Sequence, residues 1–184
     1  MTARRLLVLG GTRSGKSRYA LDWAKAVGGD DVTFIATARL GDPDLDDRIA
    51  AHRAYRPGSW RTIEAGLDLP AALAAAPGGG RPDAVLLVDC LTLWVSALVE
   101  AERPVAPAWD ALSASLDGIE ARVVAVSDEV GHGVVPAFEL GRRFRDDQGW
   151  LNQRVAAAFE EVVLMVAGLP LALKGRDPGQ ASTP

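Results

Sequence analysis

Short apolar runs alternate along the chain with segments whose apolar residues recur at helical spacing. The runs at 6–10, 84–89 and 122–127 are almost wholly aliphatic, which is typical of strands that are covered on both faces. Strands that alternate with helices form mostly parallel sheets, so we expect an α/β fold with helices on both faces. The expected strands span 6–10, 32–37, 60–64, 84–89 and 122–127, and the expected helices span 15–27, 42–57, 69–77, 90–101, 108–121, 137–145 and about 149–160.

The C-terminal part of the chain departs from this alternation. Residues 161–168 and 170–174 are apolar runs separated by a short break, which predicts a hairpin at the edge of the sheet. Residues 176–184 are mainly Gly, Pro and polar residues, and we expect a disordered tail there. A length of 184 residues suits a single hydrophobic core, so residues 1–175 are expected to form one domain.

Composition narrows the class of protein. Hydrophobic residues make up 48% of the chain, which is too many for a disordered protein. The net charge of −4 and the lack of a basic tail argue against a general nucleic-acid binder. The sequence has no apolar stretch of about 18 residues, so we expect no membrane span. The single cysteine, Cys90, lies in an apolar run, which predicts a buried free thiol and fits a reducing cytoplasm.

Ligands of parallel sheets bind beyond the carboxyl ends of the strands. The segments expected at these ends are 10–17, 37–39, 89–92 and 127–133. The first of them contains the pattern G-x-x-x-x-G-K-S, from Gly10 to Ser17. In this pattern the main-chain N–H groups and a helix N-terminus face phosphate oxygens, Lys16 reaches the β- and γ-phosphates, and Ser17 can ligate Mg²⁺. We therefore predict a nucleotide phosphate site.

Asp89 closes the aliphatic run VLLVD and is a candidate second ligand. An aspartate at the end of a central strand can hold Mg²⁺ or its water shell. The alternative is that Asp89 caps the helix that begins near Leu91. The phosphate pattern does not by itself separate an enzyme from a nucleotide switch. A guanine switch of the Ras type would show N-K-x-D, which this sequence lacks, since its one asparagine is Asn152 in LNQR.

His52 lies in the predicted helix 42–57, where Arg48 and Arg56 share its face. One interpretation is a solvated basic face, or a histidine that only makes hydrogen bonds. The other is a nucleophile, because a neutral imidazole attacks phosphorus and nearby arginines stabilise charge on phosphate oxygens. The arginines favour the neutral ring, whereas the helix C-terminus favours the charged ring, so the net effect stays open.

Five segments together resemble the bifunctional adenosylcobinamide kinase/adenosylcobinamide-phosphate guanylyltransferase family. They are GGTRSGKSRYA, FIATA, DRIAAHRAYRPGSWRTIE, LLVDCLTLWVSALV and SDEVGHGVVPAFELGRRFRDDQGWLNQRVA. The resemblance implies a P-loop sheet related to RecA, usually as a homotrimer. It also implies two reactions. ATP or GTP phosphorylates the aminopropanol hydroxyl of adenosylcobinamide, and GTP then donates GMP through a histidine to give adenosylcobinamide-GDP in cobalamin biosynthesis.

The resemblance also assigns site residues. Its guanylylated histidine lies in R-I-x-x-H, which corresponds to His52. The phosphate pattern itself makes Lys16 the second predicted catalytic residue. Asp89 stands where the family has Glu or Asp, and Ser17 and Asp89 are the expected Mg²⁺ ligands. Glu64 suits a guanine contact because a carboxylate accepts hydrogen bonds from the base. The expected nucleotide-binding residues are Gly10, Gly11, Thr12, Arg13, Ser14, Gly15, Lys16, Ser17, Ala36, Thr37, Ala38, Arg53, Ala54, Tyr55, Arg56, Glu64 and Asp89.

The sequence departs from the family pattern at Asp128, where the resemblance leads us to expect Asn. Glu129 is a weak candidate for a contact with the corrinoid or a neighbouring subunit, and His132 is interpreted as incidental. Two rival functions remain: another small-molecule P-loop kinase, with His52 merely binding phosphate, and a nucleotide-dependent regulatory module. The sequence leaves open the choice between ATP and GTP in the first step.

Overall fold

Seven strands form one sheet in the computed structural model, which describes residues 4–38 and 56–175. The strand order is β3-β2-β4-β5-β1-β6-β7, and all neighbouring pairs are parallel except β6 and β7. The strands are β1 (Arg5–Gly10), β2 (Val32–Ala36), β3 (Arg61–Glu64), β4 (Val85–Asp89), β5 (Arg122–Asp128), β6 (Glu161–Val166) and β7 (Leu169–Lys174). The predicted mostly parallel sheet with a C-terminal edge hairpin is confirmed.

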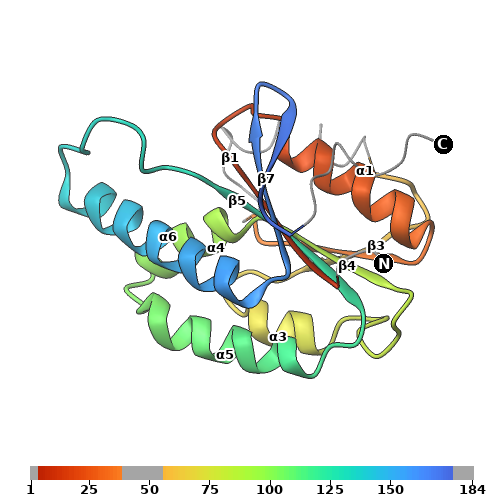
Figure 1. Ribbon diagram of the computed structural model, residues 1–184. Coiled ribbons are helices and arrows are strands. Elements are labelled where there is room, and N and C mark those ends of the chain that lie inside the picture. The colour runs from red at the N-terminus through yellow and green to blue at the C-terminus, as the bar shows by residue number, and fades with distance from the viewer. Residues whose placement is uncertain (1–3, 39–55, 176–184) are drawn as a thin grey trace.

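Helices cover both faces of this sheet (Figure 1). One face packs on α1, and the other packs on α3, α4, α5 and α6. The helices are α1 (Lys16–Gly28), α3 (Leu69–Ala74), α4 (Leu91–Glu100), α5 (Val105–Asp117) and α6 (Glu139–Ala158). Within the described residues, every helix is too short or too polar to span a bilayer.

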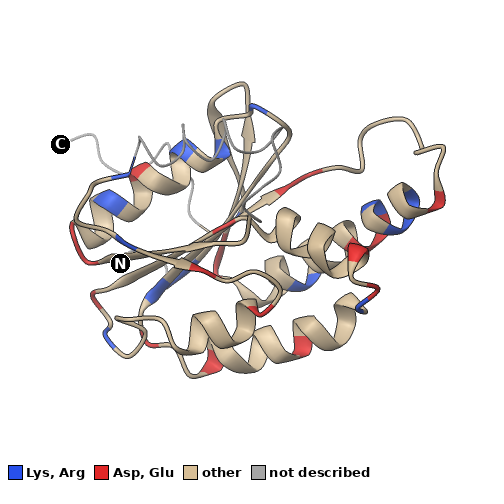
Figure 2. Ribbon diagram, turned by 180° about the vertical axis from the view of Figure 1, so that it is seen from behind, with Lys and Arg blue, Asp and Glu red and all other residues tan. Residues whose placement is uncertain are grey.

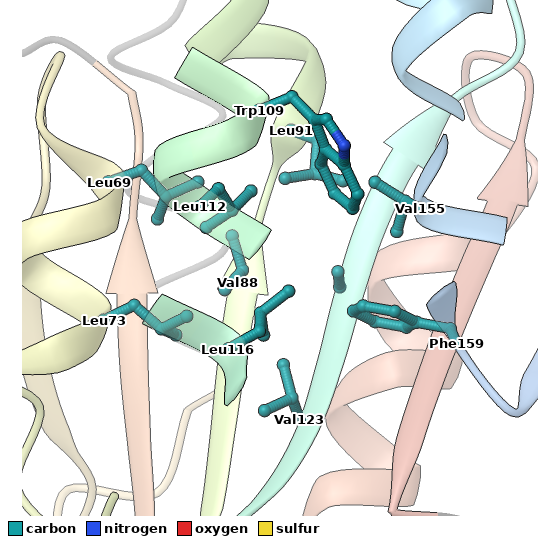
Figure 3. Close-up of a pocket in the computed structure, with 11 residues that line it drawn as sticks. Leu69, Leu73, Val88, Leu91, Trp109, Leu112, Leu116, Val123, Val155 and Phe159 are labelled. Atoms are coloured by element: carbon teal, nitrogen blue, oxygen red, sulfur yellow. The ribbon is translucent and has the colours of Figure 1, made fainter. Parts of the chain in front are cut away.

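The alternation of side chains along each strand divides the core in two. In β1, Leu6 and Val8 belong to the α1 side, whereas Leu7 and Leu9 belong to the opposite side. Successive side chains of a strand point to opposite faces, so an aliphatic run serves both layers at once. Apolar side chains from α3, α4, α5, α6 and the sheet meet around a small pocket (Figure 3). Its lining is aliphatic and aromatic, so it belongs to the core and offers no polar group to a nucleotide.

Three helices differ clearly from their predicted extents. Helix α3 ends at Ala74 instead of 77. Helix α5 spans Val105–Asp117 instead of 108–121, with Pro107 in its first turn. Proline is tolerated there because the first N–H groups of a helix have no intrahelical partner. Helix α6 is continuous over Glu139–Ala158, although two helices, over 137–145 and about 149–160, were predicted. The buried side chain of Gln148 ties this stretch to the core, and tertiary contacts outweigh the low helix propensity of Gly149.

Most of the predicted helix 42–57 lies outside the described residues. Only Arg56 and Pro57 are described, and neither is helical. The predicted tail 176–184 also lies outside the described residues.

Candidate active site

The phosphate-binding loop connects β1 to α1 at the carboxyl edge of the sheet. Gly15 has a φ of 94°, which suits glycine because it has no Cβ. A Cβ on Gly10 would lie 2.4 Å from Ser14 Oγ and 2.9 Å from Met165 O, so the loop closes only with glycine there. In the described structure no side chain caps α1. The first amides of α1 therefore remain available to an anion.

The C-terminal hairpin supports this loop from the side. The amide of Gly168, in the turn between β6 and β7, donates to Ser14 O at 3.0 Å. A Cβ on Gly15 would lie 3.4 Å from the Cα of Gly168, which shows how closely the two turns pack. The antiparallel hairpin thus fixes the shape of the phosphate loop.

Ser17 and Asp89 lie together, as predicted. The Ser17 hydroxyl is 3.5 Å from Asp89 Oδ1, at the end of β4. A hydroxyl and a carboxylate are oxygen ligands of the kind that Mg²⁺ prefers, and the nucleotide phosphates and waters complete its shell. Among the described residues no group of three or more His, Cys, Asp or Glu side chains could hold a metal by itself. The pair therefore fits a Mg²⁺ that arrives with a nucleotide.

Lys16 has an ion-pair partner that was not predicted. Its ammonium contacts Asp128 Oδ1 at the end of β5 and donates to Gly11 O at 3.3 Å. The side chains of Lys16 and Asp128 are 12% and 21% exposed, so the pair is shielded from most of the solvent.

Ala36 lies between two acidic residues that were both predicted to belong to the site. In the sheet register it pairs with Glu64 of β3 and with Asp89 of β4. Glu64 is exposed at this edge. Thr37 is fully buried, and its hydroxyl donates to Cys90 O at 2.6 Å and accepts from Cys90 N at 2.9 Å. Its side chain therefore holds the corner that presents Asp89.

Cys90 is a buried free thiol, as predicted. Burial raises the pKa of this thiol to about 12, and the neighbouring carboxylate of Asp89 adds to the effect. The thiol therefore stays protonated and is no nucleophile for the site.

The predicted site residues of the histidine segment run from His52 to Arg56. Of these, the structure describes only Arg56. Its guanidinium carbon lies 3.3 Å from the centroid of the Phe34 ring, in β2. This stacking places the end of the segment beside the strand that carries Ala36. The predicted site residues His52, Arg53, Ala54 and Tyr55 lie outside the described residues.

Comparisons with known proteins decide the family. A sequence model of the family described as cobinamide kinase / cobinamide phosphate guanyltransferase matches residues 6–173. The chain belongs to this family. Bifunctional adenosylcobalamin biosynthesis protein CobP of Pseudomonas aeruginosa is 48% identical over 171 residues, which cover 92% of this chain and 96% of that protein. Bifunctional adenosylcobalamin biosynthesis protein CobU of Salmonella typhimurium is 38% identical over 186 residues. The alignment covers 92% of this chain and 99% of that protein.

A solved structure supports the fold of this cobinamide kinase / cobinamide phosphate guanyltransferase family member. An ATPase of the type III secretion system of pathogenic bacteria superposes with a TM-score of 0.51 at 14% identity, over 91% of this chain and 56% of that one. The predicted family and the bifunctional kinase and guanylyltransferase that it implies are confirmed.

Sequence reasoning missed the polar network behind the phosphate loop of this family member. Asn152 of α6 accepts from Ser127 Oγ at 2.7 Å and donates to Asp128 O at 3.0 Å. Gln148 donates to both Ser127 Oγ and Asn152 Oδ1. All three network side chains are buried. A lone asparagine inside an apolar helix face was the available signal, but it could not name partners from a distant strand.

Proposed function

We propose that this protein phosphorylates the aminopropanol hydroxyl of adenosylcobinamide with ATP or GTP, and then transfers GMP from GTP to that phosphate through a histidine. The products are adenosylcobinamide-GDP and pyrophosphate. The observation that carries the proposal is the glycine-rich loop with Lys16 and the Ser17–Asp89 pair at one edge of the sheet, in a chain that the family model matches over residues 6–173.

In the first reaction the loop positions the terminal phosphate of the nucleotide. The N-terminal amides of α1 and the ammonium of Lys16 stabilise negative charge on the phosphate oxygens. Ser17 and Asp89 would hold Mg²⁺, which when bound supplies further neutralisation of the β- and γ-phosphates. The substrate hydroxyl attacks the γ-phosphorus in line, the bond to the nucleoside diphosphate breaks, and the hydroxyl proton leaves to solvent.

In the second reaction His52 attacks the α-phosphorus of GTP. A nitrogen–phosphorus bond forms, and the bond from the α-phosphorus to pyrophosphate breaks. The phosphate of adenosylcobinamide phosphate then attacks the same phosphorus and releases the imidazole. Two observations support this assignment: Glu64 ends β3 beside Ala36, and Arg56 stacks on Phe34 of the same strand β2 that carries Ala36.

The chain offers a matched pair for the test, because it has only two histidines. The native protein is incubated with α-labelled GTP, and label that is labile in acid but stable in alkali is mapped by peptide analysis. His52→Ala should abolish the label, and His132→Ala should retain it, since His132 is 83% exposed on a loop. Native protein that takes no label contradicts the guanylyl transfer and favours another P-loop kinase.

A second measurement separates the enzyme from a regulatory module. Native protein, Mg²⁺, GTP and adenosylcobinamide are combined, and corrinoid products are separated by chromatography. The proposal predicts adenosylcobinamide phosphate and then its GDP ester. If neither product forms although the nucleotide binds, the result favours a regulatory module and contradicts the proposed enzyme.

The proposal includes a homotrimer in the cytoplasm, where nucleoside triphosphates are supplied. Two exposed apolar surfaces support self-association. One surface lies in the segment that leads into α6 and includes Val134 and Phe138, which are 95% and 82% exposed. The other surface lies on β7 and includes Leu169 and Leu171. Patches of this kind mark protein contacts. Light scattering after size exclusion should give three times the mass of the chain, and Phe138→Asp should lower it.

A further inference from the structure

Asp128 lies beside the first glycine of the phosphate loop. β5 pairs with β1 in parallel, and Asp128 is the register partner of Gly10. The next amide, of Glu129, donates to Gly10 O at 3.1 Å. The carboxyl end of β5 is therefore acidic where it meets the loop (Figure 2).

The main chain of Asp128 is fixed from two helices. Its amide donates to the hydroxyl of Thr92, in the first turn of α4, at 2.7 Å. Its carbonyl accepts from Asn152 of α6 at 3.0 Å, within the buried network. Two packed helices thus hold the main chain that carries the Asp128 carboxylate.

The carboxylate of Asp128 uses the same cation that the phosphates need. An ammonium has three donors, and Lys16 directs two of them to Asp128 and Gly11 O. Because both side chains of the pair are mostly buried, their attraction is screened less than that of a surface ion pair. A phosphate must share Lys16 with Asp128 or take it from Asp128.

The Lys16–Asp128 pair carries no net charge, so it attracts a bare phosphate less than a lone ammonium would. Arg13 is the other cation of the loop. A free nucleoside triphosphate brings its negative charges toward the Asp128 carboxylate. A metal-bound triphosphate carries less negative charge and is repelled less.

We propose that Asp128 competes with nucleotide phosphate for Lys16 and thereby makes the loop select the metal-bound nucleotide over the free one. Asp128 is in this account a positioning residue that acts through Lys16. The inference rests on the proposed function only in requiring that the loop binds a nucleoside triphosphate.

The test measures equilibrium binding of α,β-methylene GTP, whose α–β linkage His52 cannot cleave. Native protein and Asp128→Asn are titrated by calorimetry in EDTA and in Mg²⁺. Removing one like charge a few ångströms from the phosphates should tighten binding in EDTA about tenfold, and in Mg²⁺ about twofold. Asp22→Asn removes the same charge from the outer face of α1, where the side chain is 73% exposed, and should change neither value more than about twofold.

A third variant separates charge from shape. Asp128→Glu keeps the charge, so its binding in EDTA should stay as weak as that of the native protein. The inference is overturned if Asp128→Asn binds no tighter than native in EDTA, or if Asp128→Glu binds as tightly as Asp128→Asn. Should Asp128→Asn not fold, Asp128→Ser is measured by the same criteria. Native protein that binds no triphosphate in either buffer would instead refute the proposed function itself.

Discussion

The carboxyl ends of β4 and β5 each present one aspartate to the phosphate loop, and the two differ in what they face. Asp89 faces the Ser17 hydroxyl at 3.5 Å, whereas Asp128 faces the Lys16 ammonium. A carboxylate beside a hydroxyl forms a pair of oxygen ligands, which attracts a divalent cation. A carboxylate beside the only loop lysine opposes phosphate. We therefore expect two chemically equal residues on neighbouring strands to act in opposite directions on the same nucleotide.

The two ends are also supported differently. Thr37 holds the Asp89 corner through both polar main-chain groups of Cys90. The Asp128 end is held by a buried network of three side chains, of which Asn152 makes the direct contact. Thr92 joins the two ends, because it lies three residues after Asp89 and accepts from the amide of Asp128.

The largest expected effect comes from neutralising Asp89, at the carboxyl end of β4. Asp89→Asn removes the charge that would hold Mg²⁺, so kcat of the kinase reaction should fall by about hundredfold or more. The measurement is steady-state formation of adenosylcobinamide phosphate. Asp83→Asn, in the exposed turn that precedes this strand, is the control. A kcat for Asp89→Asn within about threefold of native would contradict the assignment of Asp89.

The next effect comes from the support of the β5 end. Asn152→Ala leaves buried Ser127, Gln148 and the carbonyl of Asp128 without their shared partner. The free energy of unfolding should fall by about 2 kcal/mol, as measured by urea denaturation. Gln153→Ala changes an exposed neighbour on α6 and should stay within about 0.5 kcal/mol of native. Equal losses in both variants would show that the network adds no stability.

A smaller effect is expected at the support of the β4 end. Thr37→Val keeps the shape but removes the hydroxyl that satisfies Cys90, and should lower the free energy of unfolding by about 1 kcal/mol. Thr62→Val, at an exposed position of β3, is the control in the same urea experiment. The comparison would have to be revised if Thr37→Val lost more stability than Asn152→Ala.

The smallest effect near neutral pH concerns Cys90. Its pKa is raised from 9.0 to about 12 in the folded protein, so the unfolded chain ionises first as the pH rises. The stability that the neutral thiol contributes is complete below pH 9.0 and is lost between pH 9.0 and about 12. Native protein should therefore lose more stability over this window than Cys90→Ala. Parallel unfolding curves for the two proteins at each pH would refute this.

The sequence predicted the sheet and the placement of the phosphate loop because both depend on local signals. Aliphatic runs specify buried strands, and the spacing of Gly10, Gly15 and Lys16 specifies the loop. The pairing of Ser17 with Asp89 followed from the rule that parallel strands end at the same edge. These predictions required no knowledge of which strand lies next to which.

The partner of Lys16 could not be predicted for the opposite reason. It depends on β5 lying beside β1, a contact between residues far apart in the sequence. The network around Asn152 likewise joins α6 to β5, and the same burial makes α6 continuous where a gap at 146–148 was predicted. The role of His52 still rests on its motif.

The most direct test of the two-step account is a chase of the guanylylated protein. Protein labelled with α-labelled GTP is separated from free nucleotide, and adenosylcobinamide phosphate is then added without GTP. The account predicts that the label leaves the protein and appears in adenosylcobinamide-GDP, at a rate no slower than steady-state turnover. Label that stays on the protein, or leaves only as free GMP, would contradict it.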